Sequence, residues 1–157
     1  MNPKKNNIGS RGKSAEKKVD EWLTRMGERY VTFDWERIYD ARSAGGRFPS
    51  RPGDFAFYSL KLHGLIEVKE VEHDFRLPAK NFKTGQLAKL YKRELAGGVI
   101  RILVCHTTTG LWREVPLQWF RERLKAPSWD LSSFPTALSA AAVLDGIQRL
   151  VEQRAGS

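Results

Sequence analysis

The sequence predicts an α/β fold: a central mixed β-sheet flanked by helices, preceded by a basic N-terminal arm and followed by a C-terminal helix. Segments with the patterns of strands and of helices alternate along the chain, which is typical of this class. The 157 residues are enough for one compact core domain. Hydrophobic residues make up 41% of the chain and cysteine occurs once, which excludes a disulfide framework and a cysteine-rich zinc finger.

The charge of the chain predicts a polyanionic partner. Lysine and arginine number 27 against 18 acidic residues, so the formal net charge is +9. Such an excess favours nucleic acid or an acidic membrane surface. No apolar run approaches the roughly 20 residues of a membrane span, and the first residues lack the apolar segment of a secretory signal. We therefore expect no membrane partner and a cytoplasmic location, in a bacterial cell or, for a virus-encoded protein, in the host.

The first half of the chain begins with residues 1–13, which contain no acid and predict a flexible basic arm. A helix is expected over 14–26, where apolar residues recur at helical spacing, and a strand over 30–33. The Gly-, Pro-, Ser- and Arg-rich stretch 40–53 predicts a long loop.

The second half predicts most of the sheet. Residues 54–59 and 65–71 read as a β-hairpin across a turn at 61–64, followed by a helix over 84–95 that ends at a Gly-Gly pair. Strands follow at 99–105 and 110–115, and then a short helix at 116–124. A loop at 125–135 and an alanine-rich helix over 135–153 complete the chain. We expect a core domain over 14–125 and a helical extension over 126–157.

Chemistry-bearing residues concentrate in the predicted hairpin. Glu67 and Lys69 are two residues apart, so their side chains share one face of the strand. Antiparallel pairing brings Asp54, at the start of the first strand, within reach of both. Two carboxylates supply the hard oxygen ligands that suit Mg²⁺, and a lysine beside them can orient a water molecule or stabilise charge on a phosphate. An ordinary cross-strand ion pair is the alternative interpretation.

Two further residues are candidates for the same site. Glu16 continues the inward stripe of the first helix, where a carboxylate is costly unless it is paired or binds metal, although a solvated first-turn glutamate explains it equally well. Gln86 lies in the first turn of the helix over 84–95 and can face the same sheet edge, with a surface glutamine as the alternative.

Basic residues outside the hairpin are candidates for contacts with DNA phosphates, with a merely solvated charge run as the alternative. They come from the arm, from the loop 40–53 and from the segment around the second helix. The set is Lys4, Lys5, Arg11, Lys13, Arg42, Arg47, Arg51, Lys80, Lys83 and Lys89.

The order of motifs resembles that of the PD-(D/E)xK nuclease superfamily and, within it, RecU-type Holliday junction resolvases. The motifs run over roughly residues 8–124. They are RGKSAEKKV at 11–19, PGDF at 52–55, IEVKE at 66–70, LPAKNF at 77–82, Gln86 and GGVIRILV at 97–104.

This resemblance implies a restriction-endonuclease-like core and an Mg²⁺-dependent homodimer, with Mn²⁺ as a substitute, that makes paired symmetric nicks in a four-way DNA junction. Asp54 and Glu67, with the backbone carbonyl of Val68, would be metal ligands, and Lys69 the catalytic lysine. Glu16 and Gln86 would assist at the same site, and no small-molecule cofactor is implied. Two other functions remain open: a nuclease for flaps, ends or duplex DNA, and a non-catalytic basic DNA-binding module.

Overall fold

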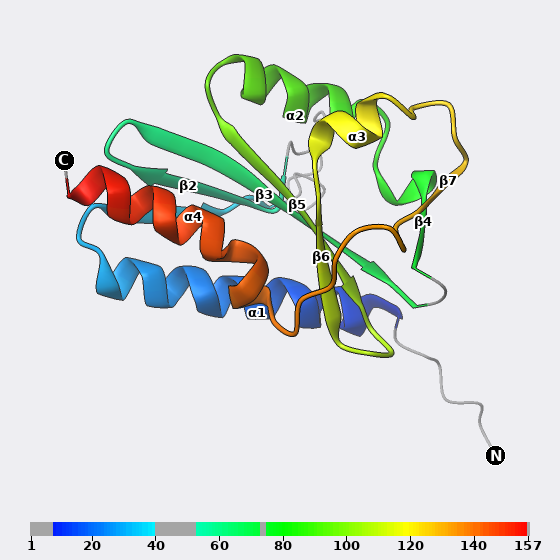
Figure 1. Cartoon of the computed structure of the whole chain (residues 1–157), viewed down its shortest axis with the longest axis horizontal. Helices are drawn as coiled ribbons and strands as arrows, with labels where there is room; N and C mark the ends of the chain where they lie inside the picture. Colours follow the sequence, from blue (N-terminus) through cyan, green and yellow to red (C-terminus); the bar gives the residue numbers. More distant parts are fainter. Residues whose placement is uncertain (1–7, 40–52, 73–74, 157) are drawn as a thin grey trace.

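The computed structural model describes residues 8–39, 53–72 and 75–156, with side chains from residue 14 onward. A five-stranded mixed sheet lies between two layers of helices (Figure 1). The helices are α1 (Ile8–Arg29), the 3-10 turn η2 (Ala79–Asn81), α2 (Gln86–Leu95), α3 (Leu117–Arg121) and α4 (Ala140–Ala155). The strands are β1 (Phe33–Arg37), β2 (Phe55–Ser59), β3 (Leu62–Val71), β4 (Arg76–Pro78), β5 (Val99–His106), β6 (Leu111–Val115) and β7 (Ser128–Asp130).

The large sheet has the order β1-β2-β3-β5-β6. All its neighbouring strands are antiparallel except β3 and β5, which run parallel and share the longest pairing, from Gly64 with Val99 to Val71 with His106. The connection between these two strands carries β4, η2 and α2 across one face of the sheet, as a parallel pair requires. The predicted α/β class with a central mixed sheet is therefore confirmed.

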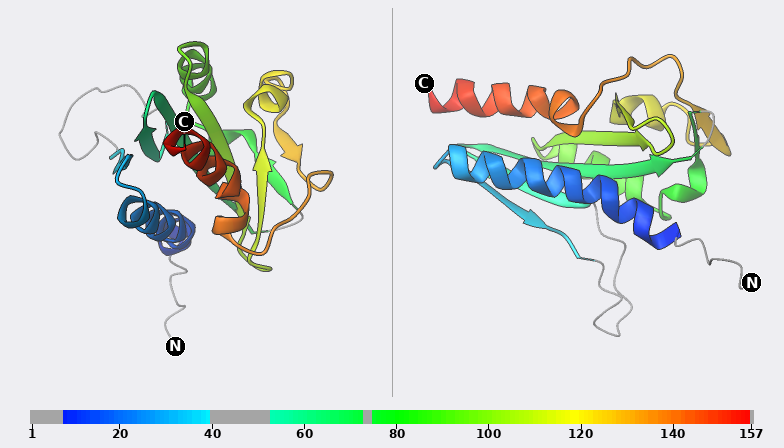
Figure 2. Two further views of the ribbon diagram at one scale, coloured as in Figure 1. Left: turned by 60° about the vertical axis from the view of Figure 1, so that its left-hand side comes forward. Right: turned by 90° about the horizontal axis from the view of Figure 1, so that it is seen from below.

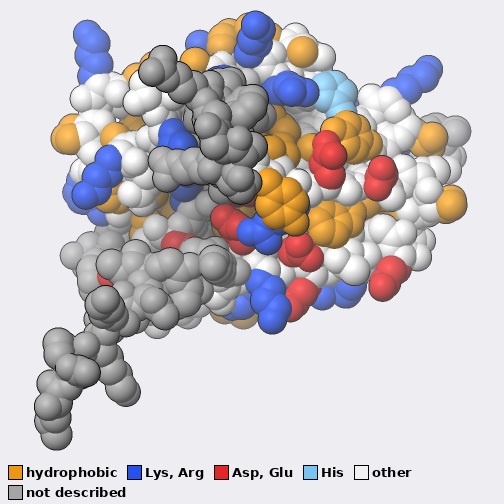
Figure 3. Space-filling view, turned by 180° about the vertical axis from the view of Figure 1, so that it is seen from behind, with side chains coloured by type: hydrophobic (Ala, Val, Ile, Leu, Met, Phe, Trp, Pro, Cys, Tyr) orange, Lys and Arg blue, Asp and Glu red, His pale blue; other side chains and the backbone are white. Residues whose placement is uncertain are grey.

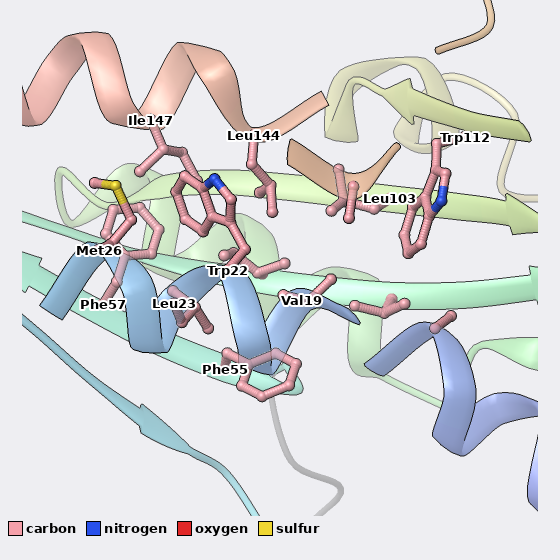
Figure 4. Close-up of a cluster of buried hydrophobic side chains, with 14 of the residues drawn as sticks. Val19, Trp22, Leu23, Met26, Phe55, Phe57, Leu103, Trp112, Leu144 and Ile147 are labelled. Carbon is pink, nitrogen blue, oxygen red and sulfur yellow. The ribbon is translucent and has the colours of Figure 1, made fainter. Parts of the chain in front are cut away.

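The two faces of the sheet bury separate clusters of apolar side chains. α1 and α4 lie side by side on one face and α2 and α3 cover part of the other (Figure 2). On the first face, Val19 and Leu23 of α1 meet Leu144 and Ile147 of α4 over Phe55, and each of the five is fully buried (Figure 4). The C-terminal helix is thus part of the packed core and shares a cluster with the first helix.

Several predicted boundaries were wrong, each for a physical reason. α1 begins at Ile8, so residues 8–13, expected in the flexible arm, are helical. The first strand was placed at 30–33 and lies at Phe33–Arg37, because an edge strand tolerates charged side chains on its solvent face. The C-terminal helix begins at Ala140, where Ser139 caps it by accepting a hydrogen bond from the amide of Ala142 at 3.1 Å.

The hairpin of β2 and β3 is confirmed, but its turn is shorter than predicted. Leu60 and Lys61 occupy the turn with φ of 22° and 62°, and β3 begins at Leu62. Gly64, expected in the turn, lies in the strand, where a Cβ would come within 2.3 Å of the ring of Phe57 and of the carbonyl oxygen of Val99. Close packing across the hairpin therefore requires this glycine.

The small sheet formed by β4 and β7 was not predicted. Each strand has three residues, and β7 falls in the segment 125–135 that was expected to be a loop. The pairing fixes β4 beside the end of the large sheet, and η2 follows it directly. Among the described residues, no helix is long and apolar enough to cross a membrane.

Candidate active site

Asp54 is held at the point where β2 begins, between the two strands that flank it. Its backbone amide donates to the carbonyl of Ile66, and its own carbonyl accepts from the amide of Ile38, both at 2.9 Å. Its carboxylate Oδ2 accepts from the amide of Val68 at 2.7 Å, and the residue is 1% exposed. The pairing of β2 with β3 ends at Phe55, and the amide of Val68 donates to the carboxylate of Asp54 in place of a backbone carbonyl.

Glu67 and Lys69 project from β3 on the face covered by α2, because Ile66 and Val68 belong to the cluster under α1 and side chains alternate along a strand. The pairing of Phe55 with Ile66 sets Asp54 opposite Glu67. Glu67 is 2% exposed, and Lys69 Nζ lies 2.7 Å from Glu67 Oε1. The hairpin therefore brings the two carboxylates and the ammonium group together, as the strand alternation predicted.

Lys69 is fixed by the segment that follows β4. Its Nζ donates to the backbone carbonyl of Asn81 at 2.7 Å and lies 4.6 Å from the centre of the Phe82 ring. It is 3.5 Å from Gln86 Oε1, a long contact. An ammonium group has three N–H donors, and short bonds to Glu67 and Asn81 use two of them. The third N–H faces Gln86 Oε1 in this long contact, which a water molecule or a phosphate oxygen can replace.

Gln86 joins the site from the first residue of α2. Gly85 precedes it in the left-handed region, at φ 79°, and turns the chain so that α2 starts beside β3. The side chain is buried, and its Oε1 accepts from the amide of Lys83 at 3.2 Å as well as facing Lys69. Gln86 thus ties the start of α2 to the lysine.

The contacts from Asn81 and Phe82 were not assigned a role from the sequence. Asn81 acts through its backbone carbonyl, which no side-chain pattern reports. Phe82 forms part of the buried cluster with Phe120 and Trp129 and presents one ring face to Lys69. An aromatic residue two positions after a lysine in LPAKNF was the one available signal.

The site holds two buried carboxyl groups and one ammonium group, so a further positive charge would be stabilised there. Burial, and after it the neighbouring charge of Asp54, raise the pKa of Glu67 to about 7, against the lowering effect of Lys69. Glu67 Oε2 is buried and accepts no hydrogen bond within the described residues, and Asp54 Oδ1 is buried as well. A buried carboxylate oxygen without a donor is costly, and a bound cation would compensate for that cost.

The donor set fits Mg²⁺. The two carboxylates are hard oxygen ligands, and the amide of Val68 points toward Asp54, so the carbonyl of Val68 is directed to the same side of the strand. Over 8–39, 53–72 and 75–156, no group of three or more His, Cys, Asp or Glu side chains is placed to hold a metal. Two carboxylates with a carbonyl suit Mg²⁺, which keeps several waters and takes further oxygens from a phosphate substrate.

Glu16 lies near the start of β2, because its partner Arg37 pairs with Phe55, the residue after Asp54, and its role at the site stays a prediction. It belongs to α1, on the other face of the sheet, and its carboxylate forms an ion pair with the guanidinium of Arg37 at the end of β1. Its side chain is 17% exposed. This pairing was not predicted, because Arg37 is 21 residues away in the chain and no local pattern joins the two.

The predicted DNA-contacting residues fall into three groups. Lys80, Lys83 and Lys89 lie on η2, before α2 and on α2, next to the site. Arg11 and Lys13 belong to α1, but their side chains are outside the described part. The remaining candidates lie outside the described residues: Lys4, Lys5, Arg42, Arg47 and Arg51.

Comparison with known proteins identifies a fold and no sequence family. No family model and no curated protein sequence matches this chain. Among solved structures, it is similar to Hjc, a Holliday junction resolvase from the archaeal hyperthermophile Archaeoglobus fulgidus. The similarity has a TM-score of 0.53 and 19% sequence identity, and it covers 82% of this chain and 98% of that chain. The likeness shows that the chain has the restriction-endonuclease-like fold expected from its sequence. A closer relation to RecU-type resolvases stays a prediction.

Proposed function

We propose that this protein is an Mg²⁺-dependent DNA endonuclease that acts on branched DNA, with the four-way junction as its substrate. One observation carries the proposal: Asp54, Glu67 and Lys69 meet at one point, where buried Glu67 Oε2 has no donor among the described residues. The fold shared with Hjc and the net charge of +9 support DNA as the substrate.

The reaction is hydrolysis of a phosphodiester bond. A water oxygen bonds to phosphorus and one P–O ester bond breaks, which leaves a phosphate monoester on one DNA end and a hydroxyl group on the other. Asp54, Glu67 and the carbonyl of Val68 would hold Mg²⁺, or Mn²⁺ in its place. When bound, this ion lowers the pKa of a coordinated water and neutralises charge on the phosphate.

The side chains of the site hold one another in place and supply one hydrogen-bond donor to the reacting groups. Lys69 is fixed by Glu67 and Asn81, and its third N–H would exchange the long contact with Gln86 for the attacking water or a phosphate oxygen. Gln86 keeps the start of α2 against the lysine. The rigid setting matters because donors fixed in advance stabilise the transition state more than mobile ones do.

The protein would act as a homodimer, since two cuts in antiparallel strands require two sites related by two-fold symmetry. Such an arrangement makes the two nicks symmetric about the junction centre. Native mass spectrometry of the DNA-bound protein would count the copies.

A cleavage assay on a synthetic four-way junction tests the proposal. The wild-type protein should make paired nicks with Mg²⁺, and Asp54→Ala and Lys69→Ala should cut at least ~100-fold more slowly while binding the junction normally. Lys61→Ala, at the exposed hairpin turn, is the matched control and should cut at the wild-type rate.

Each contrary result has a distinct meaning. Undiminished cleavage by Lys69→Ala would remove the proposed site. Equal cleavage of linear duplex, nicked DNA or flaps would remove the junction preference and leave a nuclease of broader use. Junction binding with no Mg²⁺-dependent cleavage would indicate a non-catalytic DNA-binding module.

A further inference from the structure

The helices on the two faces of the sheet differ in charge. Over residues 14–29, α1 has four basic and four acidic side chains, and α4 has two of each. On the other face, η2, α2, α3 and the residues directly after them have eight basic side chains and two acidic ones, Glu94 and Glu122. These eight form what we call the basic ridge: Lys80, Lys83, Lys89, Lys92, Arg93, Arg121, Arg123 and Lys125.

The basic ridge begins at the candidate active site. Gln86, the first residue of α2, lies against Lys69, and α2 and α3 pack on each other on the same face of the sheet as Glu67. In the space-filling view, several basic side chains line the upper rim, where α2 runs, and acidic and basic side chains are mixed below it (Figure 3). The ten residues of α2 span about 15 Å, so its last turn is about 15 Å from the site along the helix.

Two arginines of the ridge are held in place by aromatic rings. The guanidinium carbon of Arg121, on α3, lies 3.1 Å from the centre of the Tyr91 ring on α2, and that of Arg123 lies 4.4 Å from the Trp119 ring. A stacked guanidinium directs its N–H groups sideways, in the plane where phosphate oxygens bind. Because stacking already limits the rotamers of these side chains, they lose less conformational entropy when they bind a phosphate.

From this distribution of charge we infer that the basic ridge binds the phosphate backbone of a duplex arm that leads away from the cut. This inference rests on the proposed function, because the position of one phosphate at Lys69 is what places the next phosphates over α2 and α3. Duplex DNA rises about 3.4 Å per base pair, so 15 Å corresponds to roughly the first five base pairs of the arm. A row of cations over this length matches a regular polyanion.

Binding measurements in the absence of Mg²⁺, where no cleavage interferes, test the ridge. In Lys92→Gln/Arg93→Gln and Arg121→Gln/Arg123→Gln, the slope of log affinity against log salt should fall in magnitude by about 2 for each pair that contacts two phosphates. The control Arg29→Gln/Arg149→Gln removes two basic side chains from the other face, one of them also placed over a tyrosine ring, and should keep the wild-type slope. Within the described residues, the exposed pair on α2 makes no ring contact, so its result does not depend on the stability of α3.

Neutral methylphosphonate linkages locate the contact on the DNA. Placed within the first five base pairs of an arm, they should weaken wild-type binding and change the binding of the ridge variants much less. Placed beyond ten base pairs, they should weaken neither. Equal losses for wild type and ridge variants, or an unchanged salt slope in both ridge variants, would overturn the inference.

The outcomes also separate this inference from the proposed function. If the ridge variants lose salt slope but wild type cuts no DNA with Mg²⁺, the nuclease proposal fails and the ridge stands. If wild type cuts junctions and the ridge variants keep the full slope, the ridge fails and the nuclease stands. If the variants lose binding to vesicles of anionic lipid and keep their binding to DNA, the ridge is a membrane surface and the inference is wrong.

Discussion

Replacing Glu67 by glutamine should stabilise the metal-free protein at neutral and alkaline pH. The pKa of this carboxyl is raised from 4.5 to about 7 in the folded chain, first by burial and then by the charge of Asp54. Because folding raises the pKa, the protonated form favours the folded state. Its contribution to stability is fully present below pH 4.5 and is lost as the pH rises to about 7.

The magnitude follows from the same values. One pKa unit corresponds to about 1.4 kcal/mol, so the rise from 4.5 to about 7 makes the ionised Glu67 cost up to about 3 kcal/mol at pH 8. Glutamine has the same shape and no charge. For a chain of 157 residues this gain raises the Tm by roughly 6 to 12 °C.

Urea and thermal unfolding in EDTA, from pH 4.5 to 8, measure this effect. The difference in unfolding free energy between Glu67→Gln and wild type should be near zero at the acid end and grow toward pH 8. Glu122→Gln, an exposed carboxyl on the protein surface, is the control and should show no such trend. A flat difference profile for Glu67→Gln would refute the electrostatic description of the site.

Two substitutions, each with a matched control, test the fold that positions the site. Gly64→Ala places a Cβ within 2.3 Å of Phe57 and the Val99 carbonyl and should destabilise by about 2 kcal/mol or more. Gly146→Ala, in α4, places a Cβ no closer than 3.9 Å to the side chain of Arg101 and should stabilise by up to ~1 kcal/mol. Equal effects in chemical denaturation would contradict the close approach of β3 to its neighbours. Leu144→Ala should cost about 2–5 kcal/mol because α4 shares the core of α1, and Leu138→Ala, 87% exposed, should cost less than ~0.5 kcal/mol. A negligible loss in Leu144→Ala, measured by urea unfolding, would mean that α4 is not part of the core.

The central part of the site was predictable because it depends on local geometry. Strand alternation places Glu67 and Lys69 on one face, and a hairpin sets Asp54 opposite Glu67. The apolar run that became β5 was equally clear, because a strand buried on both faces is almost continuously aliphatic.

The rest depends on contacts between distant segments. The carbonyl of Asn81 reaches Lys69 because β4 pairs with β7, and these three-residue strands lie about fifty residues apart with no pattern of their own. The ion pair of Glu16 with Arg37 depends on how α1 lies across the edge of the sheet. The basic residues of the ridge were visible in the sequence. That they gather on one face of the sheet was not, because it depends on how α2 packs on α3.

Binding of Mn²⁺ to the free protein is the sharpest test of the proposed metal site, because the EPR signal of unbound Mn²⁺ reports binding without DNA or turnover. Wild type should remove Mn²⁺ saturably from solution, Mg²⁺ should compete for the same site, and Asp54→Asn should abolish the binding. Wild-type protein that leaves all Mn²⁺ free, or an Asp54→Asn variant that binds as wild type does, would contradict the proposed site.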